Sequence, residues 1–82
     1  MTTYTVKTNK HEADKIVRKK KMYIFRDDND YLRPGNVIHF NVVDNMKAIS
    51  HEIDRKGYMV TDIERGDPIR DGVILIAFSE LA

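Results

Sequence analysis

The chain has 82 residues, 33% of them charged, and a formal net charge of +1, and this length predicts a single domain, residues 1–82, with a modest core. It contains no cysteine, which excludes a disulfide framework and a thiolate metal site and suits a reducing cytoplasm. The longest apolar run, Val73 to Phe78, is far shorter than the ~20 residues of a membrane helix, so we expect a soluble, cytoplasmic protein with no leader and no membrane contact.

A short strand and an amphipathic helix are predicted first along the chain. Residues Tyr4 to Lys7 have the β-branched and aromatic composition of a strand. Asn9 follows and can accept the backbone N–H of Glu12, while the Glu12 carboxylate returns to the Asn9 N–H in a capping box, so a helix should begin there. Its apolar stripe, at helical spacing, comprises Ala13, Ile16 and Val17.

A second strand is predicted over Met22 to Arg26, where side chains alternate between two faces that both carry apolar area. We expect Tyr23 and Phe25 on this strand to be core residues, and base stacking by these two rings is the alternative. The charged segment from Asp27 to Asn36 follows, and its Pro34-Gly35 pair predicts a type II turn, because proline fixes its own φ and glycine supplies a positive one.

The C-terminal half is predicted to contain three more strands. The segment Val37 to Val43 alternates as a strand and ends at a hairpin turn that we place at Asp44-Asn45. The next segment, Met46 to Lys56, fits both a helix and a strand, so periodicity leaves its structure open. Tyr58 to Glu64 is typical of a strand, and residues 66–71 of a turn. Val73 to Phe78 then predicts a strand buried on both faces.

Positive charge is concentrated near the N-terminus. Residues 1–26 carry eight Lys or Arg and two acidic residues, whereas residues 27–82 carry six and eleven. Such a basic end suits a polyanion, although a solvated helix end is an equally good reading of the same cations. Nearby acidic side chains at positions 27, 28 and 30 could pair with them. The candidate phosphate-binding side chains are Lys19, Lys20, Lys21, Arg26 and Arg33, with Tyr31 as a candidate for base stacking.

Other common site chemistries find no support in the sequence. The histidines His11, His39 and His51 lack metal-ligand spacing and have no cysteine partners. Ser50 and Ser79 lack the context of a nucleophile elbow. We therefore expect no metal and no cofactor.

The positions Lys21, Arg26 and Asp27, followed by Leu32, Pro34, Gly35, Val37 and Ile38, resemble the motif of the ASCH family of small PUA-like domains. The resemblance covers most of the chain. It implies an α+β fold, namely a small mixed β-barrel or pseudo-barrel with one or two short helices. It also implies a noncatalytic module that binds RNA or a nucleotide in a basic cleft between the first helix and the barrel. Lys21 and Arg26 would line that cleft, with Lys19, Lys20 and Arg33 at its rim.

Three departures from the family pattern affect this expectation. The family's glycine before the lysine is replaced within Lys19-Lys20, where a positive φ would cost about 1 kcal/mol. Asn36 stands in place of an aspartate, which removes a charge and keeps an acceptor. One branch of the family resembles an amidohydrolase of acetylated cytidine with a threonine nucleophile, and Ile24 occupies that position. Isoleucine has no hydroxyl, so covalent catalysis of that kind is disfavoured.

Two alternative functions stay open at this point. One is a hydrolase that processes a modified nucleoside with Lys21 and a nearby carboxylate or tyrosine. The other is a protein interaction module, including a homodimer formed by pairing of edge strands.

Overall fold

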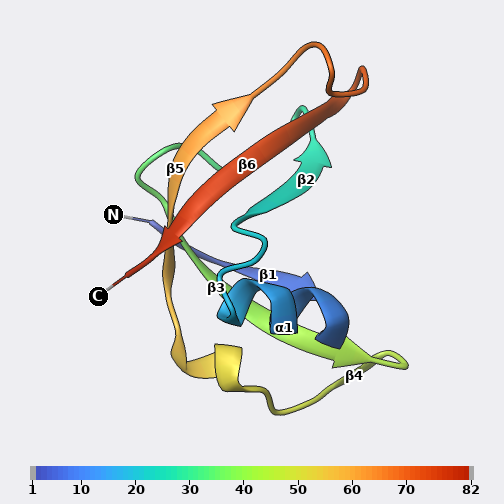
Figure 1. Cartoon of the computed structure of the whole chain (residues 1–82), viewed down its shortest axis with the longest axis vertical. Coiled ribbons are helices and arrows are strands. Elements are labelled where there is room, and N and C mark those ends of the chain that lie inside the picture. The colour runs from blue at the N-terminus through green and yellow to red at the C-terminus, as the bar shows by residue number, and fades with distance from the viewer. Residues whose placement is uncertain (1, 82) are drawn as a thin grey trace.

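The structure is a computed structural model that describes residues 2–81, and within them no helix is long and apolar enough to cross a membrane. The chain consists mainly of strands, with one α-helix near its start and one 3-10 helix in its second half (Figure 1). In chain order the elements are β1 (Thr3–Thr8), α1 (Lys10–Val17), β2 (Tyr23–Asp27), β3 (Val37–Asp44), β4 (Lys47–Ala48), the 3-10 helix η1 (Glu52–Arg55), β5 (Tyr58–Glu64) and β6 (Val73–Glu80).

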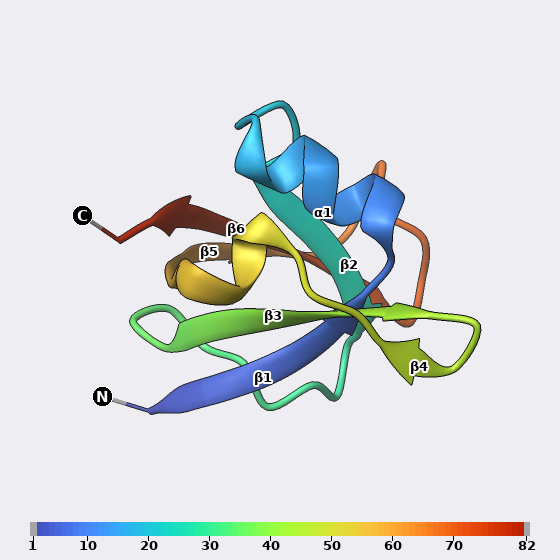
Figure 2. The same cartoon turned by 90° about the horizontal axis from the view of Figure 1, so that it is seen from below.

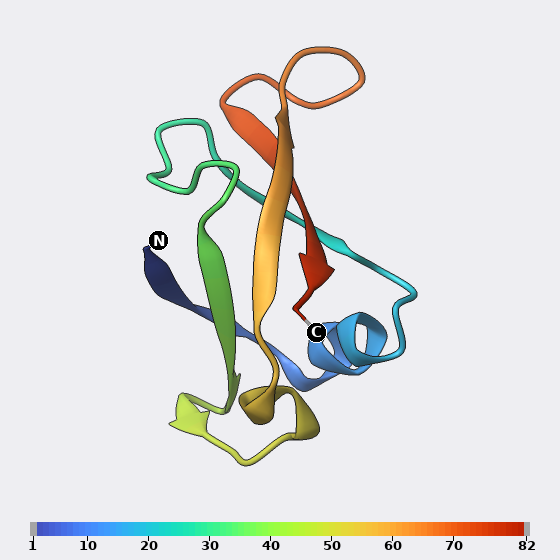
Figure 3. The same cartoon turned by 90° about the vertical axis from the view of Figure 1, so that its left-hand side faces the viewer.

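The strands form one mixed sheet of six strands in the order β1-β3-β5-β6-β2, and β4 pairs with β3 beside this path. β1 and β3 run parallel, and the other pairs are antiparallel. The sheet curls so that β1 and β2 form its two edges, and it does not close into a barrel (Figures 2 and 3). The predicted α+β class is confirmed, with one α-helix, one 3-10 helix and a sheet consistent with a mixed pseudo-barrel.

The core lies inside the curl of the sheet. Alternate residues of the strands point there, and α1 contributes Ala13 and Ile16 from its apolar stripe. Three aromatic rings pack together at the centre, with ring centroids between 5.3 and 5.5 Å apart. Edge-to-face and tilted contacts of this kind stabilise a core beyond simple burial of area. The three rings are those of Phe40, Tyr58 and Phe78.

Both faces of β2 and β6 carry apolar side chains, and the outer face of each strand is covered less than the inner face. On β6, Ile74 and Ile76 are buried while Val73 and Leu75 on the opposite face are half-buried, so the prediction of a strand buried on both faces was wrong. On β2, which was predicted as a half-buried strand, Tyr23 is 38% and Phe25 is 54% exposed. Their assignment to the core was wrong because Ile24 takes the inward face and no second layer within residues 2–81 covers the outer one.

The turn at Pro34-Gly35 has the predicted geometry. The Asn36 N–H donates to the Arg33 carbonyl over 3.0 Å, and Gly35 has a φ of 92°, as position i+2 of a type II turn requires. The β3–β4 hairpin turn lies one residue later than predicted. Its central residues are Asn45 and Met46, both with positive φ.

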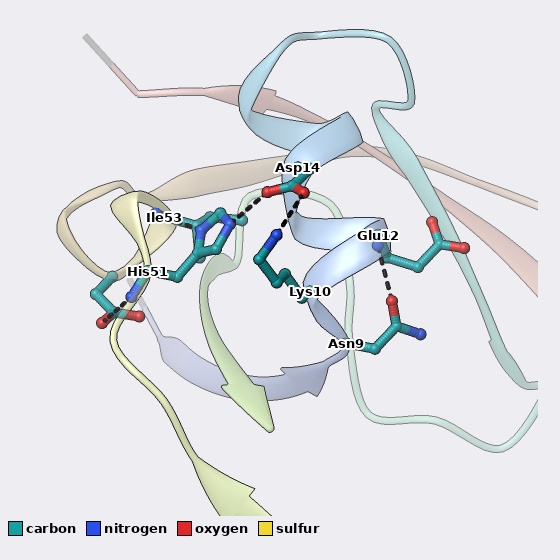
Figure 4. A network of polar contacts seen from close by, with 7 residues as sticks. Asn9, Lys10, Glu12, Asp14, His51 and Ile53 are labelled. Atoms are coloured by element: carbon teal, nitrogen blue, oxygen red, sulfur yellow. Dashed lines mark hydrogen bonds and ion pairs between the residues drawn. The ribbon is translucent and has the colours of Figure 1, made fainter. Parts of the chain in front are cut away.

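The segment with two alternative predictions contains neither a long helix nor a long strand. It forms the two-residue strand β4 and the short helix η1. The His51 side chain begins η1, because its Nδ1 accepts the Ile53 N–H at 3.1 Å while the His51 N–H donates to Asp54. The other ring nitrogen of His51 lies 2.7 Å from Asp14 Oδ1 on α1 (Figure 4). This ring therefore joins η1 to α1.

The N-terminus of α1 has half of the predicted capping box. Asn9 Oδ1 accepts the Glu12 N–H at 2.8 Å, as expected (Figure 4). The reciprocal contact was wrongly predicted, because the Glu12 carboxylate instead binds Lys21 Nζ.

The C-terminus of α1 closes with a Schellman motif. The N–H groups of Lys19 and Lys20 donate to the carbonyls of Ile16 and Lys15, over 3.0 and 2.9 Å. This motif normally places glycine at the position that Lys19 occupies. Lys19 has a φ of 59°, so the steric cost expected for the missing glycine falls on this residue.

Candidate functional site

A cavity of about 320 Å³ lies between the end of β1, the start of α1 and β2. It therefore lies between the two edge strands of the sheet, β1 and β2, which do not pair with each other. Phe40 from the aromatic core also reaches it, so part of its wall is rigid and apolar. The lining residues are Val6, Lys7, Thr8, Asn9, Glu12, Lys21, Ile24, Phe25, Arg26 and Phe40.

Lys21 is held in this cavity by two neighbours. Its Nζ lies 2.7 Å from Glu12 Oε2 and 5.4 Å from the centre of the Tyr23 ring. The hydrogen bond from Lys21 lowers the pKa of the Glu12 carboxyl from its usual value. The lysine side chain is 22% exposed, so its charge remains accessible from the cavity.

Arg26 is fixed from the opposite side. Its Nε donates to Asp30 Oδ2 at 2.8 Å, and the Asp30 side chain is only 7% exposed. The other oxygen of Asp30 accepts the Leu32 N–H at 3.0 Å, which shapes the loop after β2. Within residues 2–81 the two Nη groups of Arg26 make no protein hydrogen bond and can donate to a ligand.

Only two of the six side chains predicted for the site line this cavity, namely Lys21 and Arg26. Arg33 instead folds back on its own loop, where Nη1 donates to the carbonyls of Asp30 and Leu32, both at 2.7 Å. The four predicted residues that lie outside the lining are Lys19, Lys20, Tyr31 and Arg33.

Tyr31, Lys19 and Lys20 differ from one another in their surroundings. The Tyr31 ring is 50% exposed and packs on Tyr4, with ring centroids 4.4 Å apart. Lys19 and Lys20 follow the C-terminus of α1 and have exposed side chains. These three residues lie on the surface, and the structure does not gather them around the cavity.

Sequence reasoning missed the contribution of β1 to the site. Lys7, Thr8 and Asn9 line the cavity, and Glu12 was interpreted only as a helix cap. The capping signal located the helix start along the chain, but no local pattern indicates that this start lies beside β2. That proximity depends on the parallel pairing of β1 with β3, which is a long-range contact.

The cavity combines charge with apolar and hydrogen-bonding groups. Its lining has three cationic side chains, those of Lys7, Lys21 and Arg26, against the single carboxylate of Glu12. The hydroxyl of Thr8 adds a donor and acceptor, and the aromatic rings provide flat apolar surface. Such a set can bind an anion attached to a planar group. Within residues 2–81 no three His, Asp or Glu side chains are placed to hold a metal ion.

No protein-family model matches the chain, and no curated protein matches it either. The likeness to ASCH domains thus rests on the motif between Lys21 and Ile38.

Proposed function

We propose that this protein is a noncatalytic, ASCH-like module with a PUA-like pseudo-barrel that binds RNA, or a nucleotide fragment of it, in the cytoplasm. The observation that supports this proposal most is that Lys21 and Arg26 line the same cavity. Lys21 precedes β2 and Arg26 lies near the other end of that strand, and both side chains face one concave surface together with the start of α1.

The size of the cavity favours a single nucleotide unit. Ligand pockets usually have volumes of ~300 to 1,000 Å³, and this cavity, at about 320 Å³, lies at the lower end of that range. A longer RNA would therefore place one nucleotide inside and run the rest of its chain over the rim. Lys19 and Lys20 would then contact neighbouring phosphates. These exposed cations outside the cavity would thereby contribute to RNA binding.

Phosphate recognition would combine two different cationic groups. Arg26 can donate through its planar Nη groups, whereas Lys21 acts as a point charge. Glu12 already neutralises Lys21 at 2.7 Å, so an incoming phosphate must compete with this carboxylate. We therefore expect modest affinity that falls as salt concentration rises.

The test is a fluorescence titration of the full chain with short single-stranded and structured RNAs and with single nucleotides at several salt concentrations. We expect Lys21→Glu to weaken binding by at least about tenfold, because it removes an attraction and adds a repulsion. Lys20→Glu, which changes a rim cation, should weaken binding by less.

Lys47→Glu is the matched control, since it makes the same charge change on β4, outside the cavity lining. The proposal fails if no RNA or nucleotide binds at ~50 mM salt, where phosphate contacts are strongest. It also fails if K47E weakens binding as much as K21E, because binding would then depend on net charge alone.

A hydrolase acting on a modified nucleoside is the second candidate, and the pairing of Lys21 with Glu12 favours it. Ile24 has no hydroxyl, but Thr8 contributes one to the cavity. Against it, the lowered pKa of Glu12 makes this carboxylate a poor general base near neutral pH. Incubation with acetylated cytidine, followed by chromatography for free cytidine, tests this candidate, and absence of turnover removes it.

A further inference from the structure

The outer edge of β2 carries backbone groups that no other part of residues 2–81 pairs with. The Phe78 N–H donates to the Met22 carbonyl and the Asp28 N–H to the Gly72 carbonyl, at 3.1 and 3.0 Å. Successive residues of a strand direct these groups to alternate sides. The even-numbered residues therefore face β6, and the N–H and C=O groups of Tyr23 and Phe25 face away from the sheet. The Asp27 carbonyl also faces outward, but it accepts the Asp30 N–H at 3.0 Å.

This edge also carries exposed aromatic surface. Tyr23 and Phe25 are 38% and 54% exposed, and their rings contact each other edge-to-face at 5.8 Å. Beside Phe25 lies a largely apolar hollow of about 480 Å³ over β6 and the preceding loop, with Leu75 and Ile69 in its wall. The other edge strand differs, because the exposed residues of β1 are threonines and a lysine. Exposed apolar edges of the β2 type are sites of strand pairing.

We propose that β2 pairs with β2 of a second copy of this chain, antiparallel, about a two-fold axis at Ile24. This edge of β2 also borders the cavity described above, so a second copy and a ligand in the cavity compete for the same space. In this register Tyr23 lies opposite Phe25 of the second copy, and Phe25 lies opposite its Tyr23. Both are outward-facing residues, so their free N–H and C=O groups meet as hydrogen-bonded pairs. Both side chains also point to the same face, as cross-strand partners do, and form an aromatic pair on each side of the axis.

The charges at the two ends of β2 select this arrangement. Lys20 and Lys21 precede the strand, Asp27 ends it and Asp28 follows it. With Ile24 at the axis, Lys21 lies opposite Asp27 of the second copy, and Lys20, at the end of the Schellman motif outside β2, lies on the side of Asp28. A parallel pairing would instead bring lysine to lysine and aspartate to aspartate, so the sequence opposes it.

Two of these charges are free for such a contact. Within residues 2–81 neither Lys20 nor Asp28 has an ion-pair partner for its side chain, and both side chains are exposed. Lys21 already binds Glu12, so the contact from Lys20 should contribute most of the charge dependence. The dimer has a short strand as its interface and buries less than ~1,200 Å², which is typical of weak, concentration-dependent association.

Sedimentation velocity of the full chain at concentrations from ~5 µM to ~1 mM tests the proposal. We expect the mass to rise from that of one copy to that of two, with half-association on the order of 100 µM. The single variants Lys20→Asp and Asp28→Lys should each weaken association roughly tenfold, because like charges then face each other. The double variant K20D/D28K restores opposite charges and should associate within about threefold of the wild type.

Lys47→Asp on β4 is the control with the same charge change away from β2, and it should leave association unchanged. Thermal melting of each variant checks that the fold is intact. The proposal is overturned if the chain is a monomer at ~1 mM. It is also overturned if the double variant associates as weakly as the two single variants, because the charges would then not be opposite. A trimer or an open-ended polymer also contradicts the two-fold arrangement.

Discussion

Lys21 Nζ lies 2.7 Å from Glu12 Oε2, and this contact joins the first turn of α1 to the residues that lead into β2. The two residues are separated by the rest of the helix and by the Schellman motif at its end. The ion pair therefore closes a loop in the chain at the wall of the cavity.

This pair should make stability depend on pH in the acid range. The contact with Lys21 lowers the pKa of Glu12 from 4.5, so its contribution is complete above about pH 4.5 and is lost as pH falls through the lowered value in the folded state. Glu12→Gln should therefore unfold at lower urea concentration at pH 7, and the difference should shrink at pH 3. The control Glu64→Gln, on the exposed end of β5, should show no such change.

The same substitution should strengthen ligand binding. Glu12→Gln removes the only carboxylate of the cavity lining and leaves Lys21 without its competitor. We expect the affinity for RNA or a nucleotide to rise by roughly threefold to tenfold at low salt. The titration described for Lys21→Glu measures this change, and a weaker affinity would show that Glu12 positions Lys21 for the ligand.

Replacement of Lys19 by glycine should stabilise the fold. Lys19 has a φ of 59° at the end of α1, and glycine adopts this conformation without the clash of a Cβ atom. We expect the free energy of unfolding to rise by about 1 kcal/mol, measured by urea unfolding. Lys20→Gly is the matched control: it also removes one lysine, but at a residue without a positive φ, so it should not stabilise.

The hydroxyl of Tyr58 has no hydrogen-bond partner within residues 2–81, and its side chain is fully buried. Tyr58→Phe should raise the free energy of unfolding by about 1 kcal/mol, because it removes a buried polar group that is not satisfied. Tyr4→Phe, at a half-buried ring, should change stability little. A loss of stability in Y58F would mean that an ordered water satisfies the hydroxyl.

Tyr58 should also affect stability at high pH. Burial, together with the charges of Glu80 and Glu52, raises its pKa to about 12. The unfolded chain loses this proton near pH 10, so stability should fall between about pH 10 and 12. Tyr58→Phe should show a smaller decline in urea unfolding across that range.

His51 should stabilise the fold both as a cap and as a link to α1. Its Nδ1 accepts the Ile53 N–H, and its Nε2 contacts Asp14. His51→Ala should lower the free energy of unfolding by about 1 kcal/mol. His51→Asn keeps an acceptor for the cap but is too short to reach Asp14, so its stability should lie between those of the wild type and H51A. Equal stabilities of the two variants would assign the whole effect to the contact with Asp14.

The elements with strong local signals were predictable from the sequence. The cap at Asn9, the turn at Pro34-Gly35 and the alternation of β3 all appear where short-range chemistry placed them. A steric cost was expected for any positive φ within Lys19-Lys20, and the structure has the positive φ at Lys19. These features depend on a few neighbouring residues and on fixed backbone rules.

Features that depend on tertiary contacts were harder to predict. Periodicity divides β2 into two apolar faces, but it does not say which one a neighbour covers, so Phe25 was wrongly placed in the core. Arg33 looked like a free cation, yet two backbone carbonyls of its own loop take up its guanidinium. The convergence of Lys21 and Arg26 on one cavity was anticipated from the family resemblance and not from charge pattern.

Asn9 and Glu12 both start the helix and line the cavity. Fraying of the first turn of α1 would therefore also dismantle one wall of the pocket. A bound ligand that holds this wall in place must slow the opening of that turn. Amide hydrogen exchange at Glu12 and Ala13 would therefore report whether a ligand is bound. The first turn of α1 thus couples its own folding to ligand binding in the cavity without any movement of the sheet.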